Sequence, residues 1–542
     1  MVSLVLQLAY LAATQNALTN YWHKTTDRTF TGLYRVNAFD LAIMIPYFLV
    51  LIILAMYGLH RYWLVYNFFK YAKNVPGTPP PVANWPRVTI QLPIFNERYV
   101  IERLVEAVSR FDYPRELLDI QVLDDSTDET QEVARNCVER YAAAGLPIVY
   151  VHRANREGFK AGALENGLKT AHGEFIAIFD ADFLPEPDFL RRTIPYLQDS
   201  KTAMVQTRWT YINSDYSLLT EVETILLDGH FIIEHGARAR RGAFFNFNGT
   251  AGVWRRAAIT DAGGWQHDTL TEDTDLSYRA QLRGWKFLYL PQIECASELP
   301  VDINGFKAQQ ARWAKGLMQT AKKILPRVLR SDAPWHVKAE AFFHLTANIS
   351  YPLMILLSTM LLPAMIVRFY QGWLQMLVID LPLFLASTCS ISSFYLVAQR
   401  VLRPQNWWRT FLYLPFVMAT GIGISVRNAK AVLEAIFGVH SEFARTPKYR
   451  IEGRNDTFVK KSYGNKAGWI PFAEVALGFY FLFTVAYAVR YENYATVPFL
   501  LLFVWGYLYT GFMSLGQTYF AHLRFGVRAP EMRPAASGAP GF

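Results

Sequence analysis

Cysteine is scarce in this chain: there are three in 542 residues, at Cys137, Cys295 and Cys389. They are widely spaced, and no two of them have the spacing of a zinc-binding or redox motif. The sequence therefore predicts neither a thiolate metal site nor a disulfide framework. Such a composition is typical of a domain that faces the cytosol.

Charged residues are also few. They make up 18% of the chain, below the ~25% of ordinary globular proteins, so part of the chain is expected to contact lipid. The net charge of +9 is modest, and the basic residues gather beside apolar segments. This distribution indicates orientation in a membrane and argues against a nucleic acid as partner.

The chain contains several long apolar runs. The first predicted span covers residues 39–59, and His60 and Arg61 after it place its C-terminal end inside. Four further spans are predicted at 345–367, 374–396, 469–489 and 495–515. The apolar residues 1–18 fit a span, an interfacial helix or a degenerate signal segment, and the sequence leaves these alternatives open.

Residues 410–426 form one more apolar segment, but basic residues flank it on both sides, among them Arg409 and Arg427. Both ends are therefore expected inside, and residues 410–437 are predicted to be re-entrant or interfacial. The expected organisation is a membrane region at 1–84, a cytosolic domain at 85–340, a second membrane region at 341–516 and a cytosolic tail at 517–542.

In the cytosolic domain, short β-rich runs alternate with longer helical patterns. The predicted strands are 88–92, 120–123, 148–151 and 175–179. Each is almost continuously apolar, as expected of parallel strands covered by helices on both faces. The pattern predicts an α/β domain that binds its ligand at the carboxyl ends of the strands.

Acidic residues stand where two of these strands end. Asp180 and Asp182 are two residues apart in an extended segment and point the same way. This suits a hard divalent cation that bridges them to a substrate diphosphate, although either could instead cap the following helix. Asp124 and Asp125 are placed to bind a base or ribose, or to shape a turn.

Two motifs further along add cations and a base. Lys160 lies in a Gly-flanked segment from which it can reach a phosphate, and a solvated surface lysine fits the pattern equally well. Thr271-Glu272-Asp273 follows a Gly-rich loop, and Asp273 can accept a hydroxyl proton as that hydroxyl attacks C1 of a sugar. One such base suffices for a single displacement with inversion.

Gln309-x-x-Arg312-Trp313 lies 36 residues after Asp273. The Arg312 guanidinium can hold a diphosphate leaving group by a two-pronged charge-assisted bond. Trp313 offers a flat apolar face on which a pyranose can stack. A surface helix with one buried tryptophan is the alternative for this motif alone.

The segment after Trp313 has apolar residues at helical spacing and basic residues elsewhere around the helix. The apolar positions are Leu317, Ala321, Ile324 and Val328, and the basic ones are Lys315, Lys322, Lys323, Arg327 and Arg330. This pattern predicts an interfacial amphipathic helix, kinked at Pro326, in the headgroup layer. A surface helix of the cytosolic domain is the alternative.

Taken in order, these motifs resemble those of the membrane-embedded processive β-glycosyltransferases of family 2, which include cellulose synthase, cellulose-synthase-like proteins, hyaluronan synthase and curdlan synthase. The matching motifs are Asp124-Asp125-Ser126, Asp180-Ala181-Asp182, Phe247-Asn248-Gly249-Thr250, Thr271-Glu272-Asp273 and Gln309-x-x-Arg312-Trp313. The Asn-Gly-Thr form is more similar to the cellulose-synthase-like proteins that make mannan and glucan backbones than to bacterial cellulose synthase.

The resemblance covers most of the chain and implies a GT-A fold, a Rossmann-like mixed sheet inserted between transmembrane helices. It implies Mg²⁺ or Mn²⁺ as cofactor. The implied roles are metal binding for Asp182 with Asp180; donor binding for Asp124, Asp125, Lys160, Asp180, Gln309 and Arg312; catalysis for Asp273 with Glu272 and Thr271; and acceptor binding for Trp313, Phe247, Asn248, Gly249 and Thr250.

Residues 440–466 contain a segment similar to the gating loop of cellulose synthase. Phe443, Thr446 and Lys448 match its Phe-x-Val-Thr-x-Lys motif, while Arg445 stands at the valine position. The segment is basic and shows no apolar periodicity, so we expect it to stay mobile until an anionic nucleotide orders it. No cyclic-di-GMP-binding domain is expected after the last span.

These features predict an inverting, metal-dependent, processive glycosyltransferase in the plasma (inner) membrane with a cytosolic catalytic domain. We expect it to extend a β-linked glucan or mannan from UDP-glucose, the favoured donor, or GDP-mannose. The growing glycan would cross the lipid bilayer, with a possible periplasmic or envelope export partner. A non-processive enzyme that makes a glycolipid on ceramide or polyprenyl phosphate is the alternative; a transporter or sugar-binding receptor is a more distant one.

Overall fold

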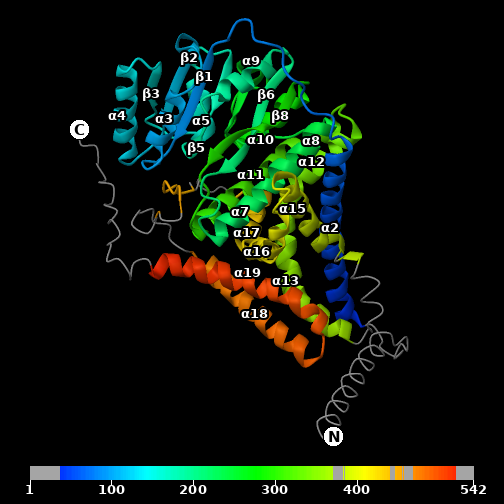
Figure 1. The fold of residues 1–542 in the computed structure, drawn as a ribbon. Coiled ribbons are helices and arrows are strands. Elements are labelled where there is room, and N and C mark those ends of the chain that lie inside the picture. Colours follow the sequence, from blue (N-terminus) through cyan, green and yellow to red (C-terminus); the bar gives the residue numbers. More distant parts are fainter. Residues whose placement is uncertain are drawn as a thin grey trace, which may run out of the picture.

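The computed structural model describes residues 37–369, 382–383, 385–439, 446–453, 456 and 468–520. Figure 1 shows the sheet of an α/β domain at one end of the molecule and the hairpin of α18 (Ile470–Arg490) and α19 (Val497–Leu515) at the other. The predictions that fall outside the described residues concern 1–18, 374–381 of a predicted span, Phe443 and Arg445 of the gating-like loop, and most of the tail.

An eight-stranded mixed sheet forms the centre of the α/β domain, in the order β3-β2-β1-β4-β7-β6-β8-β5. Its parallel half consists of β1 (Val88–Ile94), β2 (Leu118–Asp124), β3 (Ile148–His152) and β4 (Phe175–Ile178). These are the four predicted strands. The other half consists of β5 (Phe183–Leu184), β6 (Thr202–Tyr211), β7 (Gly252–Arg255) and β8 (Lys286–Ser297).

The strands are buried on both faces: one face of β1 and β2 is apolar, and on the other Gln91 donates to Gln121 at 3.1 Å. All seven residues of β1 are buried, and helices cover the sheet on each side. One core contains Ile90 and Leu104, the latter from α3 (Ile101–Ser109). The other contains Ile176 and Leu164, the latter from α5 (Phe159–Leu168). The predicted mixed α/β sheet is thus confirmed.

The register of the parallel half brings the acidic pairs to one edge. Both β2 and β4 pair with β1 in parallel, so their carboxyl ends lie on the same side of the sheet. Asp124 ends β2, and Asp180 follows β4 by two residues. The antiparallel strand β7, which pairs with β4, begins directly after the loop that carries Gly249 and Thr250.

Among the residues that the structure describes, four helical segments are long and apolar enough to cross a membrane, and the chain is a membrane protein on this evidence. They are Ala38–Lys70 (α2), Trp335–Val367, Ile470–Arg490 and Tyr494–Thr518. The first, second and fourth contain the predicted spans 39–59, 345–367 and 495–515, and the third contains all but the first residue of 469–489. The first begins sharply because Asn37 and Asp40 form a capping box at its N-terminus.

Residues 407–437 form a bent pair instead of one straight helix. The segments Trp407–Gly423 and Ser425–Phe437 meet at 43°, and the first of them contains α16 (Thr410–Gly423). The second is α17. A broken span and a re-entrant segment both have this shape, so the re-entrant or interfacial placement stays a prediction.

The interfacial placement of the helix after Trp313 stays a prediction, and the structure shows what its apolar stripe contacts. The residues belong to α11 (Ile303–Arg330), one helix that continues through Pro326. Its apolar stripe packs against α10 (Glu272–Leu282), α12 (Trp335–Thr346) and α17. Lys315 pairs with Glu434 and Lys323 pairs with Asp275. Other helices of the protein therefore cover the apolar stripe of α11.

Close packing of α16 on α19 requires glycine at Gly506. A methyl group there would collide with the carbonyl of Ala419, whereas a methyl group at Gly421 would meet nothing within 4 Å. We expect Gly506→Val to destabilise the protein by ~1–3 kcal/mol, the usual cost of overpacking, and to lower the melting temperature in detergent. Gly421→Val is the matched control, and equal melting temperatures for the two variants would contradict this packing.

Candidate active site

Asp124 and Asp125 are each fixed by neighbouring groups at the sheet edge. Asp124 is fully buried; its Oδ1 accepts from the Ser126 amide at 2.9 Å and its Oδ2 from the Tyr150 hydroxyl at 2.6 Å. Asp125 accepts from Arg153 Nε at 2.8 Å. The predicted nucleoside-binding carboxylates therefore have set orientations. Sequence reasoning missed Tyr150 and Arg153, whose signal was their place on and directly after a predicted strand.

Lys160 lies in the first turn of α5 and joins two of the predicted motifs. Its Nζ is 2.5 Å from Asp180 Oδ1 and donates to the Gly249 carbonyl at 2.9 Å. The Asp180 amide in turn donates to Thr250 Oγ1 at 2.9 Å. Because the Lys160 side chain is only 19% exposed, the solvated surface lysine considered as an alternative is ruled out.

Asp182, the predicted metal ligand, contacts Lys448 of the predicted gating loop. Lys448 Nζ lies 2.7 Å from Asp182 Oδ2 and also donates to the carbonyl of Glu298. The lysine is buried. Two residues that are 266 positions apart in the sequence thus form an ion pair at the edge of the sheet.

The segment around Lys448, residues 446–453, is docked onto the α/β domain; we call it the strap. The Tyr449 amide donates to Glu298 Oε1 at 2.9 Å, and Tyr449 and Ile451 are buried with Val301. The prediction of a loop without an apolar anchor is therefore wrong for the strap. Tyr449 and Ile451, two residues apart, were the signal in the sequence.

Asp273 lies in the first turn of α10, where the helix dipole favours a negative charge. Its Oδ1 accepts from the Thr274 amide at 2.6 Å. Gly249 has φ +81°, and a side chain there would come within 3.0 Å of Asp273 Oδ2. The absence of a side chain at Gly249 keeps this face of the carboxylate open. Thr271 is turned away, with its Oγ1 3.0 Å from that of Thr320 on α11.

Arg312 of α11 lies within electrostatic range of four carboxylates, those of Asp180, Asp182, Glu272 and Asp273. Burial lowers the pKa of its guanidinium, and the carboxylates act in the opposite direction. Gln309 and Trp313 are both half-buried. Gln309 lies three residues before Arg312 and shares its side of the helix, whereas Trp313 directly follows Arg312 and is directed to a neighbouring side. Of this motif, Arg312 is the residue that the structure brings to the carboxylates.

Burial of this cluster shifts the proton affinities of its members. Burial raises the pKa of Asp273 to about 7; Glu272 adds to the rise, while Lys160 and Arg312 reduce it. Burial likewise raises the pKa of Glu272 and Asp180. Burial alone would lower the pKa of Lys160, but the surrounding carboxylates raise it above its ordinary value. The cluster therefore combines a cation that stays charged with a carboxylate that titrates near neutrality.

Two of the predicted acceptor residues are in the interior. Phe247 is fully buried, with its ring 5.8 Å from that of Trp254, and Thr250 is fully buried behind Asp180. The prediction that they touch the acceptor is therefore wrong: Phe247 is a core residue, and Thr250 positions Asp180. Gly249 and Asn248 remain at the site.

Asn248 is held by two histidines that the sequence did not reveal. His230 Nε2 lies 3.1 Å from Asn248 Oδ1, and His235 Nε2 lies 2.8 Å from Asn248 Nδ2. Both histidines belong to the π-helical turn η3 (His230–His235), a rare geometry that is frequent at functional sites. Glu234 of the same turn accepts from His230 Nδ1 at 2.9 Å.

Asp180 and Asp182 are the residues that fit a divalent cation. Within the described ranges, no group of three or more His, Cys, Asp or Glu side chains could hold a metal by protein ligands alone. Magnesium and manganese commonly use one or two carboxylates together with substrate phosphates. One oxygen of each aspartate faces a lysine, which leaves the other for a cation that arrives with a diphosphate.

Comparison with known proteins shows which family the α/β domain matches. Residues 86–316 match the family described as Glycosyltransferase like family 2. A solved mannosyltransferase from Pyrobaculum calidifontis, in complex with GDP-Man and Mn²⁺, overlaps with a TM-score of 0.49 at 20% identity, over 72% of this chain and 99% of that one.

Relatives of known sequence extend the match beyond this domain. The chain is 49% identical over 255 residues to glucomannan 4-beta-mannosyltransferase 2 of Arabidopsis thaliana, covering 46% of this chain and 48% of that protein. The chain thus spans about half the length of that relative. It is 32% identical over 450 residues to probable glucomannan 4-beta-mannosyltransferase 15 of the same plant, covering 80% of each. The chain therefore belongs to the family 2 glycosyltransferases of the cellulose-synthase-like type, with the GT-A fold.

Proposed function

We propose that this protein is an inverting glycosyltransferase that adds mannosyl units from GDP-mannose to the end of a β-linked glycan. The observation that carries the proposal is the meeting of Asp273 with Lys160 and Arg312 at the sheet edge. This arrangement combines a base that titrates near neutrality with two cations for a diphosphate. The names of the relatives favour a mannosyl donor over the UDP-glucose expected from the sequence.

Arg312 and Lys160 would hold the leaving group. A guanidinium can bind two phosphate oxygens at once, and the Lys160 ammonium is held in reach by the Gly249 carbonyl. Asp180 and Asp182 would hold Mg²⁺ or Mn²⁺, which when bound neutralises charge on the diphosphate. Asp124 and Asp125 would receive the nucleoside at the neighbouring strand end.

Asp273 would act as the general base. The acceptor hydroxyl loses its proton to Asp273 as its oxygen attacks C1 of the donor sugar. The bond from C1 to the diphosphate oxygen breaks, and the nucleoside diphosphate leaves with the electron pair from the opposite face, so the configuration inverts. Trp313 would stack beneath the acceptor sugar, and Asn248, held by its two histidines, would bind acceptor hydroxyls.

The strap would exchange partners when the donor binds. Lys448 pairs with one oxygen of Asp182, and a cation at the other oxygen, together with its diphosphate, would weaken that pair. The freed ammonium is then positioned to pair with the diphosphate.

We extend the proposal to processive synthesis with transfer of the glycan across the plasma membrane from a cytosolic active site, since α11 joins the site to the apolar helices.

The proposal is tested by identifying the donor that the protein uses and the product that it makes. Purified protein in nanodiscs is incubated with labelled GDP-mannose or UDP-glucose, and the products are sized and subjected to linkage analysis. We expect incorporation from GDP-mannose into long, β-linked chains. A product of single sugars on lipid would support the glycolipid alternative, and no transfer from either donor would refute the proposal.

Replacement of the base should abolish turnover and spare donor binding. Asp273→Asn keeps the shape of the side chain but removes the proton acceptor, so we expect kcat to fall ~10²–10⁴-fold. Affinity for GDP-mannose, measured by calorimetry, should change little. Asp332→Asn, at an exposed carboxylate after α11, is the control. Near-normal turnover of Asp273→Asn would remove this residue from the reaction.

The rate should depend on pH through Asp273. Protonated Asp273 cannot accept the proton, and its pKa is raised to about 7. We therefore expect kcat/KM to be full above this pH and to fall about tenfold per unit below it. Glu272→Gln should move the acidic limb to lower pH because the charge of Glu272 raises the pKa of Asp273. A limb near the ordinary aspartate value of ~4 in both proteins would exclude this assignment.

Removal of the strap lysine should have opposite effects on cation binding and turnover. Lys448→Ala frees Asp182 from its competing ammonium, so we expect severalfold tighter binding of Mn²⁺ to the nucleotide-free protein, by electron paramagnetic resonance, on electrostatic grounds. Turnover should fall because the diphosphate loses a partner. The exposed Lys201→Ala is the control. Unchanged Mn²⁺ affinity together with full activity would show that the strap has no part in the reaction.

A further inference from the structure

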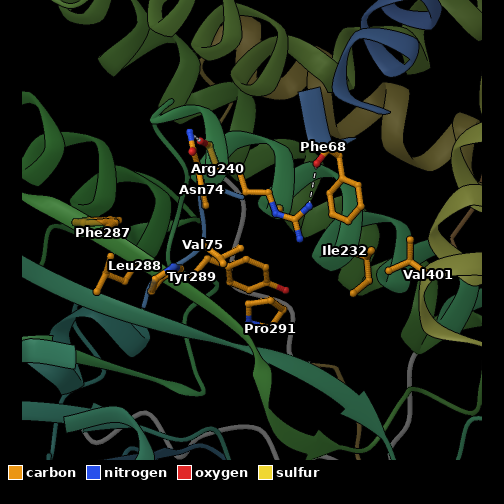
Figure 2. A pocket seen from close by; sticks show the side chains of 13 residues that line it. Phe68, Asn74, Val75, Ile232, Arg240, Phe287, Leu288, Tyr289, Pro291 and Val401 are labelled. Atoms are coloured by element: carbon orange, nitrogen blue, oxygen red, sulfur yellow. Dashed lines mark hydrogen bonds between the residues drawn. The ribbon is translucent and has the colours of Figure 1, made fainter. Parts of the chain in front are cut away.

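A cavity lies away from the proposed active site, where α2 meets the α/β domain. It has a volume of about 280 Å³ and is lined mainly by apolar side chains. Phe68 comes from α2, Ile232 from η3, Phe287 from β8 and Val401 from α15 (Ser390–Leu402). Figure 2 shows these side chains around the guanidinium of Arg240 and the ring of Tyr289.

Two of the polar side chains that line the cavity, Tyr289 and Arg240, lack a hydrogen-bond partner and a counter-charge, respectively, in the described part of the chain. The Tyr289 hydroxyl is buried and has no hydrogen-bond partner among the described residues. Arg240 donates to the Phe68 carbonyl at 2.9 Å and lies over the Phe68 ring. No carboxylate of the described ranges lies within 4.0 Å of its guanidinium. A half-buried cation without a counter-charge favours an anionic ligand.

More positive charge surrounds this end of α2. Arg241 lies over the Trp63 ring, and Lys70 lies within electrostatic range of Arg241. Neither basic side chain pairs with a carboxylate in the part of the chain that the structure describes. Lys70 and Arg241 repel each other, and binding of an anion beside them relieves that repulsion.

The cavity is at the depth of a lipid headgroup layer. Exposed aromatic side chains gather on the last two turns of α2, at Tyr62, Trp63, Tyr66 and Phe69. Aromatic residues at the end of an apolar helix mark the boundary between lipid and water, and a basic residue such as Lys70 follows on the inner side. Phe68 lies in this same turn, so the cavity is beside the boundary.

From these contacts we infer that the cavity binds an anionic phospholipid, with the phosphate on Arg240 and the first carbons of an acyl chain between Phe68, Ile232 and Val401. The volume is below the ~300–1,000 Å³ that enclose a whole small-molecule ligand. It suits part of a chain whose remainder stays in the bilayer. The adjoining cations account for the charge of the headgroup, as juxtamembrane basic residues do for acidic lipids. This site is separate from the proposed sugar transfer and does not depend on it.

The test is retention of lipid by the whole protein. Protein is released from nanodiscs of phosphatidylcholine and phosphatidylglycerol, and the bound lipid is identified by native mass spectrometry. We expect enrichment of phosphatidylglycerol over its share of the nanodisc. Arg240→Gln should reduce that enrichment about tenfold, as loss of one charge-assisted contact implies. Val401→Trp, which fills the cavity, should remove the bound lipid altogether.

The matched control is Arg409→Gln, because Arg409 likewise lies over an aromatic ring, that of the exposed Trp408, but outside the cavity. It should retain phosphatidylglycerol like the parent protein. Equal retention by Arg240→Gln, Val401→Trp and the parent would overturn the proposal, as would retention that simply follows the nanodisc composition. Displacement of the lipid by inorganic phosphate would assign the site to free anions and overturn it too.

A second measurement does not depend on the folding of variants. A phosphatidylglycerol analogue with a photoreactive group near the glycerol end of its acyl chain is irradiated with the parent protein. We expect labelled peptides that contain Ile232 and Val401. Labelling confined to the lipid-facing surfaces of α18 and α19 would contradict the site.

Discussion

Lys160 is held between the Asp180 carboxylate and the Gly249 carbonyl, and the arrangement of the active-site cluster depends on this contact. Without a cation there, Asp180 and Asp273 would both bring negative charge to one buried edge. Burial of an unpaired charge is costly. The contacts of Lys160 with Asp180 and with the Gly249 carbonyl therefore hold α5, the end of β4 and the Gly249 loop together. The pKa of Asp273 stays raised because burial outweighs the lowering by Lys160.

Helix α11 extends this cluster toward the membrane region. At one point it presents Arg312 to the carboxylates, and a little earlier Lys307 forms a buried ion pair with Glu474 of α18 at 2.7 Å. Further along, Lys315 pairs with Glu434 of α17. A buried ion pair that loses one partner leaves an uncompensated charge, so α17 and α18 are held in register with the helix that carries the proposed diphosphate ligand.

The parallel half of the sheet and the edge that carries the acidic residues could be predicted because burial on both faces leaves a continuous apolar run in the sequence. The position of Arg312 followed from its motif. Partners of the motif residues could not be predicted in the same way. Tyr150 and Arg153 reach Asp124 and Asp125 only because β3 lies beside β2, a long-range pairing that local patterns do not encode.

The composition of the basic segments did not reveal their tertiary contacts. The basic residues of α11 suggested a headgroup layer, but Glu434 and Asp275 lie opposite two of the lysines. The strap looked mobile because it is basic, yet two apolar side chains anchor it. Phe247 belongs to a motif at the site, but its ring packs inward against Trp254. Gly249 is the residue of that motif that lies beside Asp273.

The central claim is that the buried, partly compensated cluster makes Asp273 a base that titrates near neutrality. Infrared difference spectroscopy of the donor-free protein against Asp273→Asn isolates the titration of this carboxyl. The account predicts a midpoint at pH about 7 that moves higher in Lys160→Met, because Lys160 lowers the pKa of Asp273. A midpoint near the ordinary value of ~4, unchanged in Lys160→Met, would contradict it.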